Sequence, residues 1–181
     1  MLFSDSELPG ALIVDLERHV DERGFFARSF CEREFALHGL PVRFPQCNLS
    51  YNAKRGTLRG MHFEALPSSE SKLVRCVRGA IHDVIIDLRA DSPSYLRWTS
   101  AVLSAANGRA LFVPASFAHG FITLADDTDV LYHMGDFFRP GAARGIRWND
   151  PRFSITWPEA PSVISERDAN YPDFDAERLG A

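Results

Sequence analysis

Residues 58–89 read LRGMHFEALPSSESKLVRCVRGAIHDVIIDLR, a pattern that decides the fold. Two mostly apolar, partly β-branched runs, 72–77 and 81–88, are separated by Arg78 and Gly79. Runs of this length and composition predict β-strands, and a glycine between two such runs predicts a hairpin turn. We therefore expect two adjacent antiparallel strands.

Ionisable side chains in the same stretch predict the floor of an active site. Side chains alternate between the two faces of a strand, so Asp83 and Asp87 share one face while His82 lies on the other. We expect Asp83 to point into a concave sheet. His62, Lys72 and Asp83 are residue types suited to acid/base chemistry, because a base needs an orienting partner and a developing oxyanion needs a cation.

Gly60 is predicted to bend the strand that carries His62. Strict alternation would put Arg59 and His62 on opposite faces of that strand. Both side chains can line one pocket only if Gly60 marks a bulge or a bend.

Turn signals recur along the rest of the chain at the spacing of a β-sandwich or barrel. Further strands are expected at 11–16, 44–51, 97–103, 110–114, 120–124 and 130–138, and one short helix at 32–38. The strand at 44–51 alternates Gln46, Asn48 and Ser50 on one face, which predicts a polar inner wall. The sequence thus predicts an all-β fold with a few short helices.

Length and composition favour one domain over residues 1–181, with the segment 158–181 packing across the barrel. A chain of 181 residues with 45% hydrophobic residues can bury a substantial core.

A net charge of −4 argues against non-specific nucleic-acid binding. No apolar run approaches the roughly 20 residues of a membrane span. Three cysteines without CxxC spacing, and an N-terminus without a signal-peptide pattern, predict a cytoplasmic protein.

The sequence offers little support for a metal ion or a bound cofactor. A cupin-type metal site needs an HxH pair, and His62 is followed by Phe63 and Glu64, so only His119 remains as a second ligand. No GxGxxG, Walker or GxSxG motif is present. We expect no metal, no cofactor, and acid/base chemistry by side chains alone. Four other histidines have ordinary structural explanations: His19, His38, His82 and His133.

Ordered motifs over nearly the whole chain resemble one enzyme family. They are HVDERGFF, QCNLS, LRGMHF, SKLVRCVRGAIHDVIIDLR, SPSYLRW, LSAANGRALFVPASFAHGF, DVLYHMGDFF, GIRWNDPRF, ITWP and SERD. With these motifs the sequence is similar to the dTDP-4-dehydrorhamnose 3,5-epimerases, which act on nucleotide sugars. The resemblance implies a metal-free jelly-roll (cupin-like) β-barrel and a nucleoside-diphosphate 4-keto-6-deoxy sugar as substrate. It also implies a homodimer that exchanges N-terminal strands.

The resemblance further implies a role for each matching residue. His62 matches the base, paired with Asp168, and Tyr132 matches the acid on the opposite side of the sugar. Lys72 matches the cation that stabilises the oxyanion, with Asp83 beside it. The matching substrate-binding positions are Arg23, Phe26, Arg28, Gln46, Asn48, Arg59, His119 and Phe138.

Two positions near the expected substrate depart from the family pattern. Family members commonly have Glu where this chain has Arg28, and Tyr where it has Phe138. A carboxylate suits thymine, whose N3–H is a donor, whereas Arg offers only donors and suits the acceptors of cytosine. His133 and Met134 also replace residues that are usually Lys or small, which leaves open whether C3, C5 or both are inverted.

Three hypotheses follow. The first is a 3,5-epimerase of dTDP-4-dehydro-6-deoxyglucose, and the second is a single-carbon epimerase of another nucleotide sugar such as a CDP-sugar. The third is a catalytically silent, cupin-like binding module, which would have no need to keep acid and base together.

Overall fold

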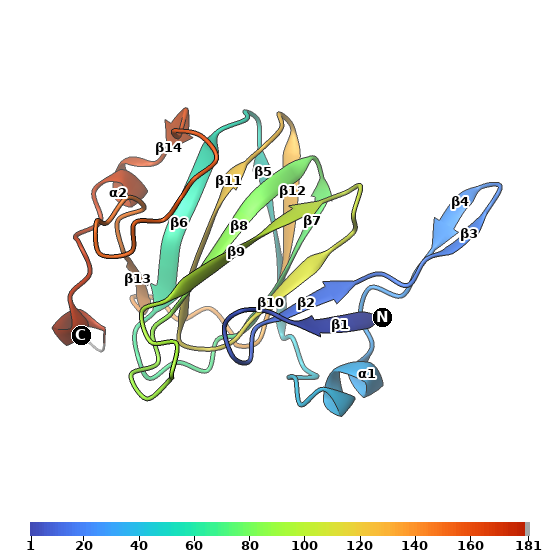
Figure 1. Cartoon of the computed structure of the whole chain (residues 1–181), viewed down its shortest axis with the longest axis horizontal. Helices are drawn as coiled ribbons and strands as arrows, with labels where there is room; N and C mark the ends of the chain where they lie inside the picture. The colour runs from blue at the N-terminus through green and yellow to red at the C-terminus, as the bar shows by residue number, and fades with distance from the viewer. Residues whose placement is uncertain (180–181) are drawn as a thin grey trace.

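The structure is a computed structural model that describes residues 1–179, and within them two six-stranded β-sheets stack face to face (Figure 1). The first sheet has the spatial order β1 (Leu2–Asp5), β2 (Leu12–Asp15), β10 (Ala110–Val113), β7 (Lys72–Arg78), β12 (Thr128–Met134) and β5 (Gln46–Asn52). The second has the order β13 (Ala143–Gly145), β6 (Thr57–Glu64), β11 (Phe117–Thr123), β8 (Ala80–Asp87) and β9 (Trp98–Ser104). A short strand, β14 (Val163–Ile164), pairs with β6 in parallel. The predicted all-β jelly-roll fold is confirmed.

The predicted hairpin of residues 72–88 is wrong. Strand β7 pairs with β10 and β12 in the first sheet, whereas β8 pairs with β9 and β11 in the second. Gly79, at φ +75°, turns the chain from one sheet to the other, and a Cβ there would lie 2.3 Å from Oγ1 of Thr128. An alternating pattern predicts which face of a strand is buried, but not which strand lies beside it. Strands β7 and β8 lie in different sheets, and each buries its inner face in the core between them.

The core between the sheets confirms the predicted orientation of β8. Ile81 and Ile85 share this core with Val74 and Cys76 of β7. Asp83 lies on the same inward face and is fully buried. Its apolar neighbours in the sequence, including Val84 and Ile86, point to the outer face of the second sheet and belong to another cluster.

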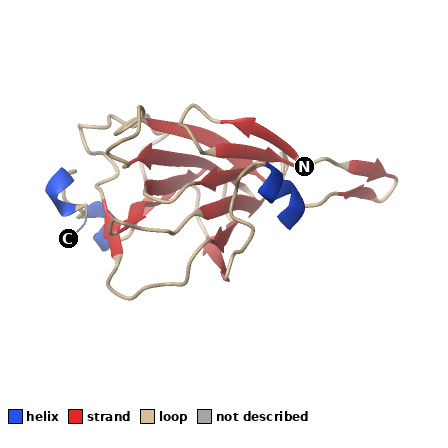
Figure 2. Cartoon of the chain, turned by 90° about the horizontal axis from the view of Figure 1, so that it is seen from below, coloured by secondary structure: helices blue, strands red, loops and turns tan. Residues whose placement is uncertain are grey.

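Both outer faces of the sandwich are partly covered. Apolar side chains from the C-terminal part of the chain, including Phe153, Trp157 and Phe174, pack on the outer face of the second sheet. The helix α1 (Glu32–Leu37) buries Phe35 against the outer face of the first sheet. Figure 2 shows α1 near the N-terminus, and α2 (Glu166–Ala169) and the 3₁₀ turn η1 (Ala176–Arg178) at the opposite, C-terminal end.

A two-stranded ribbon projects from the body next to α1 (Figure 1). It consists of β3 (His19–Asp21) and β4 (Gly24–Phe26), which pair only with each other among the described strands. Val20, Phe25 and Phe26 are exposed on it, Phe26 to 77%. Large apolar side chains on an isolated ribbon indicate a surface made for contact with another molecule.

The described part of the chain, residues 1–179, contains no helix with the length and apolar character that a membrane span requires.

Candidate active site

A cavity of about 260 Å³ opens between the sheets, and we call it the central pocket. The first sheet contributes Asn48, Ser50, Lys72, Tyr132 and Met134 from β5, β7 and β12, and the second contributes Arg59, His62, His119 and Phe121 from β6 and β11. The two walls of the pocket therefore carry different ionisable groups. His62 stands on one wall, and Lys72 and Tyr132 stand on the other.

The predicted bend at Gly60 is confirmed. His62 pairs with His119 and Arg59 pairs with Phe121, so β6 fits two residues opposite the single Gly120 of β11. Gly60 has φ +131°, and a Cβ on it would lie 2.5 Å from Cα of Gly120. Only glycine allows the strands to approach so closely. The bulge lets Arg59 and His62 line the same pocket.

Asp168 of α2 holds the imidazole of His62. Oδ1 of Asp168 lies 2.8 Å from Nε2 of His62, and its Oδ2 accepts the backbone N–H of Gly60 at 3.0 Å. Ser165, the N-cap of α2, accepts the backbone N–H of Asp168 at 3.1 Å. Burial raises the pKa of Asp168, but the hydrogen bonds from His62, Gly60 and Ser165 outweigh it, so the net pKa is lowered. The carboxylate is therefore an acceptor, and the hydrogen bond to it requires hydrogen on Nε2 of His62.

Tyr132, on the opposite wall, is suited to donate a proton. Burial raises the pKa of its phenol, and a hydrogen bond with Ser50 only partly opposes this effect. The hydroxyl thus keeps its proton at neutral pH. The ring also meets the imidazole of His119 edge-on, with centroids 6.2 Å apart. The pocket accordingly has an imidazole held by a carboxylate on one wall and a protonated phenol on the other.

Lys72 and Asp83 each have a bonded partner of their own in the structure. Asp83 bonds through Oδ1 to Nε2 of His119 at 2.8 Å, whereas the ion-pair partner of Lys72 is Glu70, at 3.1 Å. Asp83 lies on β8 of the second sheet, whereas Lys72 lies on β7 of the first. Asp83 therefore fixes the ring of His119, and Glu70 holds the ammonium group of Lys72.

A second cavity of about 180 Å³, the entrance pocket, shares His62 and Lys72 with the central pocket. Its other lining residues are Phe63, Glu64, Glu70, Phe138, Arg139, Ala143 and Arg167. Arg139 pairs with Glu64, and Arg167 lies over the ring of Tyr171, 5.6 Å from its centroid. The sequence reasoning missed Glu70, Arg139 and Arg167. Of these three residues, only Arg167 could have been found from the sequence, because it stands directly before Asp168 in the SERD motif.

The structure gathers most of the predicted site residues. His62, Lys72, Tyr132, Asn48, Arg59 and His119 line the central pocket, Asp168 and Asp83 hold the two histidines, and Phe138 lines the entrance pocket. Gln46 does not line either cavity, and its Oε1 accepts the backbone N–H of Phe138.

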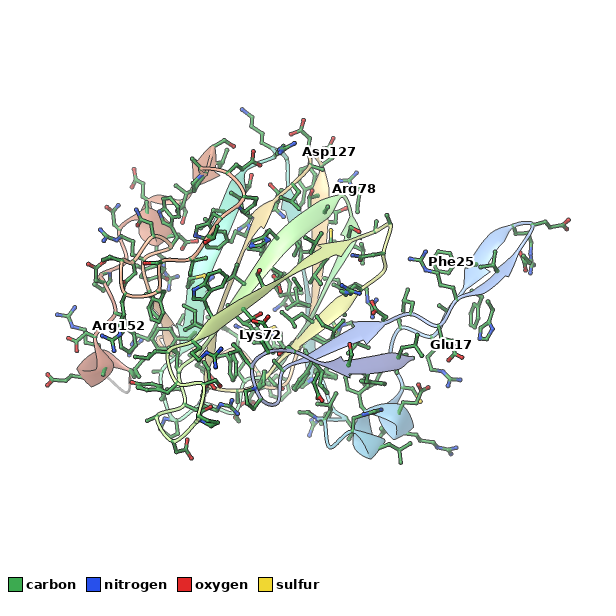
Figure 3. All side chains as sticks on the ribbon, in the orientation of Figure 1. Glu17, Phe25, Lys72, Arg78, Asp127 and Arg152 are labelled. Atoms are coloured by element: carbon green, nitrogen blue, oxygen red, sulfur yellow. The ribbon has the colours of Figure 1, made fainter. Side chains whose placement is uncertain are left out.

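Three predicted site residues lie outside both pockets of their own chain. Arg23 and Phe26 stand on the ribbon and its turn, and Arg28 follows the ribbon and donates to Glu34 at 2.9 Å. Figure 3 shows Phe25 on the projecting ribbon, well apart from Lys72 in the body of the molecule. Within one chain, these three residues do not join the site.

Within residues 1–179, no group of three or more His, Cys, Asp or Glu side chains is placed so that it could hold a metal ion. His62 and His119 are cross-strand neighbours, but each is bonded to its own carboxylate.

Comparison with known proteins identifies the family. The family model described as dTDP-4-dehydrorhamnose 3,5-epimerase matches residues 5–176. A dTDP-4-dehydrorhamnose 3,5-epimerase of Methanothermobacter thermautotrophicus is 43% identical over 172 residues, which cover 93% of this chain and 92% of the relative. The crystal structure of such an epimerase from Bacillus anthracis, with TDP and PPi bound, superimposes with a TM-score of 0.92 at 37% identity over 96% of this chain and 99% of that one.

A third similar protein bears on which carbon is inverted. ChmJ, a 3'-monoepimerase from Streptomyces bikiniensis solved in complex with dTDP-quinovose, has a TM-score of 0.87 at 32% identity over 97% of this chain and 89% of its own. Three findings agree: the family model matches most of the chain, relatives of similar length share its sequence, and solved structures of the family share its fold. This chain belongs to the dTDP-4-dehydrorhamnose 3,5-epimerase family.

Proposed function

We propose that the protein is a cofactor-independent epimerase that converts dTDP-4-dehydro-6-deoxyglucose to dTDP-4-dehydrorhamnose by inverting C3 and C5. One observation carries this proposal: His62 with its carboxylate partner and Tyr132 stand on opposite walls of a single pocket. Epimerisation needs this arrangement, because a proton must leave one face of the sugar ring and another must arrive on the opposite face.

Proton removal falls to His62. The C4 carbonyl of the substrate acidifies the protons on C3 and C5, so a neutral imidazole can remove one of them. Asp168 keeps hydrogen on Nε2 and leaves Nδ1 as the base. Lys72 supplies the positive charge that stabilises the enolate oxygen formed at C4.

Proton delivery falls to Tyr132. Its hydroxyl is protonated at neutral pH because burial raises its pKa, so it can donate to the enolate from the first-sheet wall. Protonation on the face opposite to His62 inverts the carbon, and the keto group is restored. No electron leaves the substrate, so the reaction consumes no redox cofactor.

The nucleotide half of the substrate is held by the cationic part of the site. Arg59 and Lys72 line the central pocket, and no carboxylate lines it. Asn52 fixes the side chain of Arg59 by accepting from Nε at 2.7 Å. Arg59 and, in the entrance pocket, Arg167 suit the negative charges of a diphosphate, while Lys72 serves the sugar. Glu34 accepts from Nη1 of Arg28 within the chain, and the thymine nucleotide in this proposal is taken from the family of the chain and not from Arg28.

The working unit in this proposal is a homodimer with exchanged N-terminal ribbons. The exposed apolar residues of the ribbon support it, as does the position of Arg23, Phe26 and Arg28 outside the pockets of their own chain. In a dimer, the ribbon of one copy would bring these side chains to a nucleotide held by the other. Equilibrium sedimentation at micromolar concentration gives twice 20.3 kDa if the dimer forms, and a monomer mass contradicts it.

The reaction takes place in the cytoplasm in this proposal, where the free cysteines Cys31, Cys47 and Cys76 stay reduced.

A second candidate function is inversion at a single carbon. Two observations favour it: Met134 lines the central pocket beside the acid, and the chain resembles a 3'-monoepimerase over nearly its whole length. The same base must meet a rotated enolate to invert the second carbon, so the shape of the pocket decides between one inversion and two.

Proton NMR in D₂O tests both candidates. The purified protein is mixed with dTDP-4-dehydro-6-deoxyglucose, and the signals of the C3 and C5 protons are followed separately. Loss of both signals, with conversion to dTDP-rhamnose by a coupled reductase, supports the 3,5-epimerase. Loss of one signal identifies a single-carbon epimerase. If neither signal falls, the same experiment with the CDP-linked sugar decides between another nucleotide and a silent binding module.

A further inference from the structure

Arg75 is a buried cation on the outer face of the first sheet, and the reaction described above makes no use of it. Its side chain is only 6% exposed, and within residues 1–179 no carboxylate forms an ion pair with it. Burial lowers the pKa of the guanidinium to about 10, which Asp15 opposes only at longer range. Burying a charge without a counter-ion is costly, so its hydrogen bonds must account for its position.

The bonds of Arg75 join two segments that are distant in the sequence. One nitrogen, Nη2, donates to the carbonyl of Ser29 at 3.3 Å, and the other, Nη1, donates to the carbonyl of Gly108. Ser29 follows β4 and forms one root of the ribbon. Gly108 belongs to residues 105–109, which connect β9 to β10 and which we call the β9–β10 turn.

The other root of the ribbon is bound to the same turn. Arg18, directly before β3, donates from Nη2 to the carbonyl of Ala106 at 2.6 Å. Its guanidinium also lies over the ring of Phe25 on β4, 4.5 Å from the centroid. One arginine thus connects both ribbon strands to the turn.

The conformation of the β9–β10 turn is fixed by hydrogen bonds within it. Oδ1 of Asn107 accepts the backbone N–H groups of Ser104 and Arg109 at 3.0 and 2.9 Å. Gly108 has φ +66°, and a Cβ on it would lie 2.7 Å from Leu16 Cδ1 and 3.0 Å from Arg18 Nη2. The chain that leads into the ribbon therefore lies directly against the turn.

We propose that Arg75 and Arg18 are positioning residues that seat the ribbon on the β9–β10 turn and so fix the direction in which Arg23, Phe26 and Arg28 reach a nucleotide held by a second copy of the chain. This inference rests on the proposed dimeric function. It assigns the two arginines a role in substrate affinity, although neither touches the pockets of its own chain.

Two single variants and one control test the proposal. Arg75→Met keeps an unbranched apolar side chain in the buried position and removes both hydrogen bonds. Replacing a buried, unpaired charge by an apolar side chain does not by itself destabilise a protein, so we expect this variant to fold. Arg18→Met removes the second contact at an exposed site, so it serves if Arg75→Met fails to fold. Arg78→Met is the matched control, because Arg78 is an exposed arginine at the end of the same strand, paired with Asp129 and over the ring of Tyr51, neither of which belongs to the ribbon.

The first measurement is hydrogen exchange of the amides of residues 18–29, which needs no substrate. We expect exchange about tenfold faster in Arg75→Met and Arg18→Met, and unchanged in Arg78→Met. The second is steady-state kinetics with the nucleotide sugar. We expect KM to rise about tenfold while kcat stays within about twofold of wild type, because the loosened ribbon weakens binding and leaves the reacting groups in place.

Unchanged exchange and unchanged KM in both folded variants would overturn the inference, and so would a fall in kcat at constant KM. Arg75→Lys should restore part of the affinity, since an ammonium group can reach one of the two carbonyls. Failure of the proposed function is distinguishable. A wild-type protein that epimerises no nucleotide sugar contradicts that function, while the exchange measurement still decides whether the arginines seat the ribbon.

Discussion

His62 and Asp168 are 106 residues apart in the sequence, yet Nε2 of the histidine and Oδ1 of the aspartate lie 2.8 Å apart. The second oxygen of Asp168 is bonded to the N–H of Gly60, so the carboxylate fixes both the ring and the bulge that presents it. Orientation and tautomer of the imidazole are therefore set by one side chain on the C-terminal segment.

Removing either member of this pair should abolish proton removal. We expect His62→Ala to stop the exchange of the C3 and C5 protons of the substrate with D₂O. Asp168→Asn should slow it by about 100-fold or more, because an amide cannot hold hydrogen on Nε2 as a carboxylate does. Proton NMR measures both. Wild-type exchange rates in His62→Ala would mean that another group is the base.

Tyr132→Phe should separate proton removal from inversion. The variant keeps His62, Asp168 and Lys72, so some exchange of the substrate protons is expected to continue. Without the hydroxyl, no proton arrives from the opposite wall, and net formation of the inverted sugar should stop. Deuterium incorporation is followed by NMR, and product by coupling to a reductase. Loss of exchange and inversion to the same degree would contradict this division of roles.

Gly60→Ala should destabilise the protein more than the same change at Gly24. A Cβ at Gly60 would lie 2.5 Å from Cα of Gly120, and φ is +131°. Gly24 on the ribbon has a similar φ of +124°, but nothing lies within 4 Å of its Cβ position. We expect a loss of about 1–2 kcal/mol for Gly24→Ala and of about 4 kcal/mol or more for Gly60→Ala. Urea unfolding gives both values, and equal losses would show that the close approach of the strands costs little.

Asp87 should make the stability of the fold depend on acid pH. Burial raises its pKa, but Arg89, Ser92 and Ser94 outweigh it and lower the pKa from 3.8 to about 2. Because the pKa is lower in the folded chain, the network adds stability that is present above about pH 4 and is lost as the pH falls towards 2. A shift of this size corresponds to about 2 kcal/mol.

The measurement is urea unfolding of wild type and Asp87→Asn at pH 7, 4 and 3. The difference in unfolding free energy between them should shrink as the pH falls. Asp173→Asn, which removes a carboxylate from an exposed ion pair with Arg147, is the control and should differ little from wild type at pH 7. A difference for Asp87→Asn that is constant with pH would show that its charge contributes nothing.

The sequence by itself determined the local features of this protein. Alternation of apolar and polar residues predicted the strands and the inward face of Asp83, and the spacing of Arg59 and His62 required the bend at Gly60. These properties depend on a few consecutive residues, since side chains in a strand alternate with a period of two. The family's motifs likewise matched His62 with Asp168 before any contact was known.

The tertiary structure alone decided which elements meet. It sent β7 and β8 to different sheets, paired Asp83 with His119, gave Lys72 the carboxylate of Glu70, and brought Arg139 and Arg167 to the entrance pocket. It also left Arg23 and Arg28 outside the pockets of their own chain. The physical reason is that alternation fixes the face a strand buries but not its neighbours. Those depend on how the whole chain closes around a shared core, and on contacts between residues that are far apart in the sequence.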